Sequence, residues 1–174
     1  MQFGSAVAPD TFRLERRLKA PIDRVWSYFV DAEKRSRWFN GGDDLTGLGQ
    51  SFTFLFAHFR ITNEEPPPRW AAMKSQERPM RGTILAFDPP NTLAFTWGDG
   101  DAHVSEVRFD FTADGEETVL VLTHTKIDTR DNMRNFAGGW TAHIQTLAEV
   151  LDEQRSNSFW AHVLEAHAAY ERSL

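Results

Sequence analysis

The amino-acid sequence predicts an α+β domain in which a curved antiparallel sheet of about six strands wraps around a long C-terminal helix. Short segments alternate apolar and polar residues, tight turns separate them, and apolar residues near the C-terminus recur at three- and four-residue spacing. Short links between successive strands favour antiparallel neighbours. Such a sheet twists and has one apolar face. The long helix is the only predicted element large enough to cover that face.

The first part of the chain predicts one strand followed by two short helices. Residues 1–10 are small and polar, and we expect them to be loose. Residues 12–18 alternate as a strand does. Residues 22–29 place apolar side chains at helical spacing, and residues 31–37 suit a second short helix with an aspartate cap at its start.

The middle of the chain predicts five further strands joined by turns rich in glycine, proline and aspartate. Residues 63–79 are polar and contain three consecutive prolines, so we expect an excursion between strands there. Another turn is expected at residues 98–101. The predicted strands cover residues 51–56, 83–87, 92–97, 103–112 and 118–127.

The C-terminal part predicts a long helix over residues 131–154 and another helix over residues 157–174. Gly138 and Gly139 interrupt the long helix, and each glycine costs about 1 kcal/mol relative to alanine in such a position. A helix carries that cost where something must approach its backbone or occupy the space of a side chain. Because the bulky Trp140 follows directly, we expect a helix face built around a gap that holds something apolar.

Composition narrows the class of protein. The chain has 174 residues, which suits one domain, and a net charge of −6 with no basic run, so nucleic acid is not an expected partner. It contains no cysteine, which removes disulfides and thiolate metal sites. The histidines include no pair at i,i+3 or i,i+4, and we expect no metal or cofactor. There is no apolar leader or membrane-length run, so we expect a cytoplasmic protein without a membrane partner.

Aromatic side chains are the main candidates for a ligand-binding surface. The chain has 14 Phe and 6 Trp, and several of them alternate along the predicted strands. An aromatic face can bind a ligand through burial of apolar area or can simply be filled core, and core is the safer interpretation for any one residue. The candidate aromatic residues are Phe52, Phe54, Phe56, Phe95, Trp97, Phe109, Phe111, Phe136 and Trp140.

Three polar residues are candidates for orienting a ligand. Arg16 falls on the apolar face of the first strand, where it either meets a ligand carboxylate or forms a salt bridge near the sheet edge. His124 and His143 either line the cavity or serve as satisfied structural histidines. We favour the structural alternative for all three.

Five segments, in this order, carry a resemblance to a known group of proteins. They are Leu18–Trp26, Arg37–Phe39, Asp88–Trp97, Leu122–Thr125, and Gly139-Trp140 with Leu147 and Leu151. With them the chain resembles the START-like (SRPBCC, helix-grip) superfamily, and within it the family related to the activator of heat-shock protein 90 ATPase. The resemblance implies a helix-grip domain over residues 11–155, with residues 156–174 as a helical extension, and an apolar cavity between the sheet and the long helix.

The resemblance leads to three functional hypotheses. Members of the superfamily bind lipids, polyketides, hormones and other apolar molecules, so the leading hypothesis is a binder of an apolar or amphipathic small molecule that is not an enzyme. The second is a co-chaperone that acts through its surface on an ATPase. The third is an enzyme of the cyclase or dehydratase kind. The 63–79 excursion and the last helix are expected either to cover a cavity mouth or to form a homodimer contact.

Overall fold

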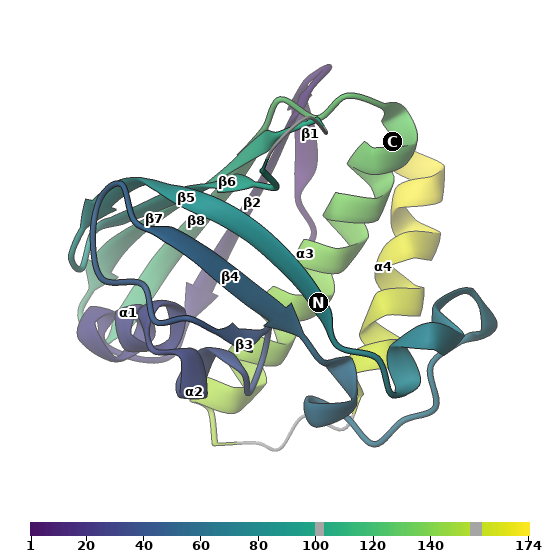
Figure 1. The fold of residues 1–174 in the computed structure, drawn as a ribbon, viewed down its shortest axis with the longest axis horizontal. Helices are drawn as coiled ribbons and strands as arrows, with labels where there is room; N and C mark the ends of the chain where they lie inside the picture. Colours follow the sequence, from purple (N-terminus) through teal and green to yellow (C-terminus); the bar gives the residue numbers. More distant parts are fainter. Residues whose placement is uncertain (100–102, 154–157) are drawn as a thin grey trace.

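A computed structural model describes residues 1–99, 103–153 and 158–174, in which a strongly curved antiparallel sheet encloses one long helix (Figure 1). This arrangement confirms the predicted α+β architecture and is consistent with a helix-grip fold. Parts of four sequence predictions lie outside the described residues: the turn at 98–101, the helix end at 154, the boundary between 155 and 156, and the helix start at 157.

The described residues form eight strands, four α-helices and two 3₁₀ helices. The strands are β1 (Ser5–Ala8), β2 (Thr11–Leu18), β3 (Gly41–Gly42), β4 (Ser51–Phe56), β5 (Arg78–Asp88), β6 (Thr92–Trp97), β7 (Ser105–Asp114) and β8 (Glu117–Thr125). The helices are α1 (Ile22–Val30), α2 (Ala32–Arg35), η1 (His58–Arg60), η2 (Pro68–Lys74), α3 (Arg130–Leu151) and α4 (Phe159–Ser173). The order across the sheet is β1-β2-β8-β7-β6-β5-β4-β3, with every neighbouring pair antiparallel.

The prediction of about six strands was wrong, because both edges of the sheet carry a short additional strand. Residues 1–10 are not simply loose: Ser5–Ala8 pairs with β2, and the Gly4 amide donates to the Tyr170 hydroxyl over 2.8 Å. At the other edge Gly41–Gly42 pairs with β4. Strands of four and two residues are too short to show an alternating pattern.

The predicted strand over 83–87 is longer in the structure, since β5 begins at Arg78 within the expected excursion. Pro79 lies opposite Leu55 of β4 in this extension. Proline and charged residues hide the alternation at the start of the strand. The remainder of the excursion includes η2, whereas β4 and β6 match the predicted strands residue for residue.

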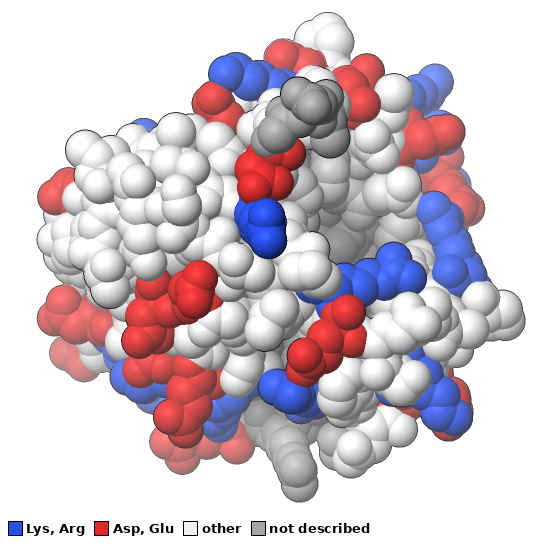
Figure 2. Space-filling view, viewed as in Figure 1, with Lys and Arg blue, Asp and Glu red and all other residues white. Residues whose placement is uncertain are grey.

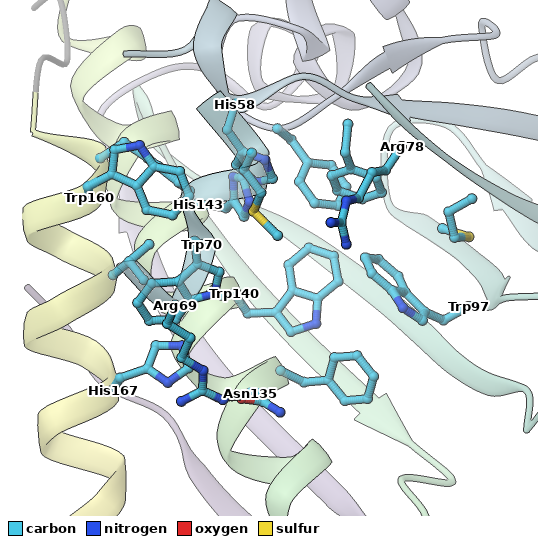
Figure 3. A pocket seen from close by; sticks show the side chains of 18 of the residues that line it. His58, Arg69, Trp70, Arg78, Trp97, Asn135, Trp140, His143, Trp160 and His167 are labelled. Carbon is cyan, nitrogen blue, oxygen red and sulfur yellow. Dashed lines mark hydrogen bonds between the residues drawn. The ribbon is translucent and has the colours of Figure 1, made fainter. Parts of the chain in front are cut away.

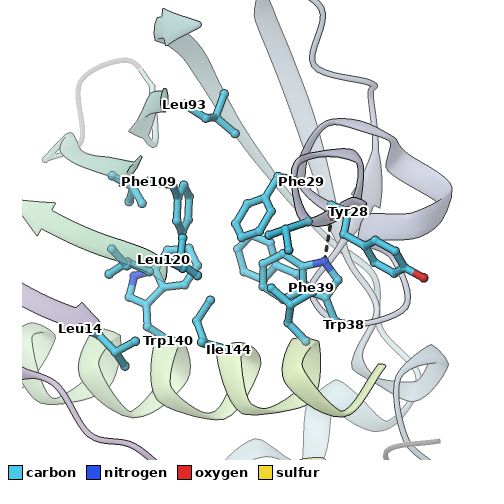
Figure 4. Close-up of a cluster of buried hydrophobic side chains, with 14 of the residues drawn as sticks. Leu14, Tyr28, Phe29, Trp38, Phe39, Leu93, Phe109, Leu120, Trp140 and Ile144 are labelled. Carbon is cyan, nitrogen blue, oxygen red and sulfur yellow. Dashed lines mark hydrogen bonds between the residues drawn. The ribbon is translucent and has the colours of Figure 1, made fainter. Parts of the chain in front are cut away.

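Packed side chains fill the middle of the space between the sheet and α3 (Figure 4). Trp140 of α3 contacts Phe109 of β7 and Phe39, with ring centroids 5.6 and 5.0 Å apart. Ile144 follows on the same helix and is 1% exposed. Burying each such side chain stabilises the fold by about 1.5–3 kcal/mol. The centre of the grip is therefore solid core, and any free space must lie toward one end of α3.

Gly138 and Gly139 occur in the helix α3 for different structural reasons. α4 packs alongside α3 (Figure 1). A Cβ added at Gly138 would lie 2.6 Å from the His167 imidazole of α4, so this close approach requires glycine. A Cβ added at Gly139 would meet no atom within 4 Å. Gly138 thus seats α4 against α3, and Gly139 leaves open space.

This difference predicts opposite effects of two adjacent alanine substitutions. Gly139→Ala should raise the free energy of unfolding by about 0.5–1 kcal/mol, because alanine favours the helix and meets nothing. Gly138→Ala should be less stable than Gly139→Ala by about 1 kcal/mol or more, because the methyl group displaces the His167 ring. Urea denaturation measures both. In a His167→Ala background the difference should vanish, and its persistence there would contradict the assignment.

Candidate functional site

A cavity of about 570 Å³ lies where the sheet, α3, α4 and the η1–η2 segment meet (Figure 3). It lies toward the N-terminal half of α3, beside the filled core. Its lining combines aromatic rings, thioethers, imidazoles and two guanidinium groups. The lining residues are Phe39, Phe56, His58, Arg69, Trp70, Met73, Arg78, Pro79, Met80, Trp97, Asn135, Phe136, Gly139, Trp140, His143, Phe159, Trp160, Val163 and His167.

Tryptophan indoles form much of the wall. Trp97 of β6 packs edge-on against Trp140 of α3, with centroids 5.2 Å apart. Trp70 of η2 stacks against Trp160 of α4 at 5.9 Å. The first pair continues the core between the sheet and α3. The second pair belongs to η2 and α4, which pack outside that core. The cavity is thus enclosed between an inner and an outer aromatic pair.

A hydrogen bond from its indole to His124 fixes Trp140. The Trp140 Nε1–H donates to His124 Nδ1 over 3.0 Å. Because Nδ1 accepts, the proton of the neutral ring is on Nε2, which donates to the Ser105 hydroxyl oxygen over 2.7 Å. Burial lowers the pKa of His124 to about 3, so the imidazole stays neutral at neutral pH. His124 therefore holds the indole from behind and does not line the cavity.

Two neighbouring histidines of the wall, His58 and His143, are neutral at neutral pH. The Nδ1–H of His143 donates to the Trp38 carbonyl oxygen over 2.7 Å, which leaves Nε2 as a hydrogen-bond acceptor. Burial, then the adjacent His58, lower the pKa of His143 to about 3. Burial, then the Arg78 charge, lower the pKa of His58 to about 4. The two imidazoles lie 5.5 Å apart, and both offer hydrogen bonding without charge at neutral pH.

The charges of the lining are positive. The Arg69 Nη2 donates to Asn135 Oδ1 over 2.7 Å, and its guanidinium lies 5.2 Å from the Trp70 ring centroid. Arg78 at the start of β5 also lines the cavity. The lining contains no aspartate or glutamate, and within the described ranges neither arginine forms an ion pair. Elsewhere on the surface charges of both signs are interspersed, and the face in Figure 2 is hollowed, with Lys or Arg side chains at the edge of the hollow.

The structure brings five of the predicted ligand-binding residues into the cavity lining: Phe56, Trp97, Phe136, Trp140 and His143. Five others, all aromatic, are buried in the core beside it: Phe52, Phe54, Phe95, Phe109 and Phe111. Arg16 lies outside the lining, where its Nη2 donates to Gln145 Oε1 of α3 over 3.0 Å. Burial lowers the pKa of Arg16, and the Glu149 carboxylate partly opposes this shift.

Most of the lining residues that sequence reasoning missed come from the chain between β4 and β5, from the start of β5 and from α4. His58 and Arg69 belong to the first of these segments and Arg78 to the second. Phe159, Trp160 and Val163 of α4 are buried against the body of the protein. From the sequence, the 63–79 excursion and the last helix were expected either to cover a cavity mouth or to form a homodimer contact. Both of them contribute to the cavity wall.

The described residues contain no group of three or more histidines and carboxylates placed to hold a metal ion. Across the same ranges no helix is both long and apolar enough to cross a membrane. The chemistry that the cavity offers is therefore apolar contact, neutral imidazole hydrogen bonding and cationic hydrogen-bond donation.

A curved sheet that grips a helix beside a ring-lined cavity defines an SRPBCC-type, helix-grip protein. The model of the family described as Activator of Hsp90 ATPase homolog 1-like protein matches residues 19–152, and the chain belongs to this family. The resemblance stated from the sequence is confirmed. A comparison with functionally curated proteins gave no significant match.

Solved structures share the fold over nearly the whole chain. A protein encoded by gene BPP1335 of Bordetella parapertussis is 38% identical with a TM-score of 0.81, covering 100% of this chain and 93% of its own. CalU16 from Micromonospora echinospora is 21% identical with a TM-score of 0.68, covering 93% and 86%. DynU16, from the dynemicin biosynthetic locus, is 19% identical with a TM-score of 0.67, covering 86% and 51%.

The buried histidines predict a loss of stability in mild acid. The pKa values of His58, His124 and His143 lie below the ordinary 6.5, so below that pH the unfolded chain binds more protons than the folded protein. Between pH 6.5 and about 4, each should remove up to about 1.4 kcal/mol of unfolding free energy per pH unit.

Urea denaturation at several pH values measures this slope. His124→Gln keeps an acceptor for the Trp140 indole but removes one titrating ring, so its slope should be smaller than that of the parent protein. His103→Gln, which changes an exposed histidine, is the control. Equal slopes for His124→Gln and the parent protein would show that His124 is not held neutral.

Proposed function

We propose that this protein binds an apolar or amphipathic small molecule in the cavity between α3, α4, the η1–η2 segment and the sheet. The observation that carries the proposal is the cavity itself, about 570 Å³ and walled by four tryptophans. Sites for small molecules are concave, mostly apolar and of 300–1,000 Å³, with a few polar groups that set orientation. The fold of this family is one that commonly holds hydrophobic ligands.

The arrangement of the walls supports a ligand-binding role for the space. Well-packed interiors leave few voids larger than a water molecule, and a filled core lies directly beside this cavity. Gly139 faces the space where any larger residue would intrude, although glycine weakens the helix. An unfilled cavity and a glycine within a helix both lower the stability of the fold. A bound apolar molecule that replaces the missing contacts accounts for both features.

The cyclase or dehydratase hypothesis has less support. Acid–base catalysis needs a group whose pKa lies near the working pH. His58 and His143, the most deeply placed polar groups of the lining, have pKa values well below that range, and no carboxylate lines the cavity within the described ranges. A neutral His143 can accept a hydrogen bond from a ligand hydroxyl. We therefore assign it to orientation of the ligand.

The second candidate function is a co-chaperone role, which the name of the family suggests. Such a role requires a contiguous docking surface. The exposed large apolar side chains in the described ranges come from separate elements, among them Leu48, Phe59, Leu85 and Leu164. The cavity is the more distinctive feature, so ligand binding is the function proposed. Stimulation of a heat-shock protein 90 type ATPase by the cavity-filled variant described below would favour the co-chaperone role instead.

Ligand binding can be measured with the neutral fluorescent probe phenylnaphthylamine, whose rings are apolar and fit a cavity of this size. We expect saturable binding to the parent protein and at least a tenfold weaker affinity for Gly139→Met, because the methionine side chain enters the space that the probe needs. Quenching of the cavity tryptophans gives a second readout.

Gly47→Met is the matched control, since Gly47 lies in a loop outside the cavity and an added Cβ there also meets nothing within 4 Å. It should bind the probe as the parent does. No saturable binding to the parent, or equal binding to Gly139→Met, would refute the proposal.

A further inference from the structure

We infer that the ligand is an apolar organic acid whose anionic group lies at the cavity edge against Arg69 and Arg78 while its apolar body lies among the indoles. This inference rests on the proposed function and adds the chemical class of the ligand. It follows from how charge is distributed over the lining, which differs between the edge and the interior of the cavity.

The charged side chains of the described lining are both arginines, and no carboxylate within the described ranges forms an ion pair with either of them. Arg69 and Arg78 are exposed and line the cavity from η2 and from the start of β5 (Figure 3). Two neighbouring glutamates are engaged elsewhere: Glu77 pairs with Arg60 at 2.7 Å, and Glu65 pairs with Lys74 at 2.7 Å. The carboxylates closest in sequence are thus neutralised by other cations, and the two cavity arginines remain available.

Arg69 is already held in place. Asn135 of α3 accepts from its Nη2 over 2.7 Å, and the guanidinium lies over Trp70 at 5.2 Å. A guanidinium has five N–H donors, so this bond leaves donors for a carboxylate or sulfonate. Little side-chain entropy is lost on binding an anion because the group is already ordered. Among the described residues Arg78 has no such side-chain hydrogen bond, and it adds a second positive charge to the lining.

The histidine end of the cavity is lined by neutral groups. His143 is 5% exposed and bonded to the Trp38 carbonyl oxygen, and the rings of His58, Phe159 and Trp160 surround this end. A charged group placed among these rings would lose its hydration, whereas the charged side chains of the described lining, Arg69 and Arg78, are exposed. The same molecule therefore has one favourable orientation: anionic group toward the arginines, apolar body toward the histidine end. Neutral apolar molecules can contact the aromatic walls of the cavity but cannot pair with the arginines.

The inference is tested with two probes that differ by one ionised group. Anilinonaphthalene sulfonate carries a sulfonate that phenylnaphthylamine lacks, and fluorescence titration gives a Kd for each. We expect the parent protein to prefer the sulfonate by roughly five- to tenfold, as for a charge-assisted hydrogen bond at an exposed site. Added NaCl should reduce this preference and leave phenylnaphthylamine binding unchanged. Dodecanoate should likewise displace phenylnaphthylamine more effectively than dodecanol, which extends the test to carboxylates.

The double variant Arg69→Gln/Arg78→Gln should lose the preference, because its affinity for the sulfonate should fall at least about fivefold more than its affinity for phenylnaphthylamine. Arg81→Gln is the matched control, because this exposed arginine lies on the same strand as Arg78 but does not line the cavity. It should keep the preference.

The outcomes separate the two proposals. Suppose that phenylnaphthylamine binds to the parent protein and binds more weakly to Gly139→Met. If the sulfonate probe then has no higher affinity than phenylnaphthylamine, or keeps its higher affinity in the double variant, the two arginines do not select the anionic group. In that case only this inference fails. If neither probe binds, the proposed function fails as well.

Discussion

The position of one side chain, the Trp140 indole, determines where the core of this protein ends and where its cavity begins. One part of the ring packs against Phe109 and Phe39, and another part lines the open space. Its Nε1–H bond to His124 fixes the ring, and the bond from His124 to Ser105 fixes the imidazole in turn. A buried donor left without an acceptor costs about 1–3 kcal/mol, so the indole cannot turn freely into the empty volume. The cavity persists because its inner wall is tied to the sheet.

The polarity of the site follows from the same balance between burial and hydrogen bonding. His143 satisfies Nδ1 with a backbone carbonyl and stays neutral, whereas the guanidinium groups of Arg69 and Arg78 lie at the exposed edge. Arg35 shows how a buried cation is accommodated elsewhere in the fold. It donates to Asn40 and to backbone carbonyls of Phe29 and Asp43, although burial lowers its pKa to about 10. The cavity interior provides no comparable set of acceptors.

Periodicity was sufficient to predict the architecture, because the strands β4, β6, β7 and β8 and the helix α3 are long enough to show their pattern. It missed β1 and β3, whose few residues carry no period. For the candidate site, the glycine pair before Trp140 pointed to a turn of α3 that contributes Gly139 and Trp140 to the cavity lining. Sequence alone cannot tell Phe56, which lines the cavity, from Phe52 and Phe54 on the same strand, because all three share one face. The curvature of the sheet separates them, and curvature depends on contacts distant in sequence. For the same reason the sequence could not predict that one cavity is lined by His58, Arg78 and Phe159.

The outer wall of the cavity depends on a helix that follows the part of the chain shared with the family. The family match ends at residue 152, whereas Phe159, Trp160, Val163 and His167 of α4 all line the cavity. The tail also reaches back to the beginning of the chain, where the Tyr170 hydroxyl accepts from the Gly4 amide. The sheet and α3 therefore form the frame of the domain, and α4 completes the wall of the chamber from outside that frame. Substitutions on the inner face of α4 can thus reshape the chamber without altering a residue of the sheet or of α3.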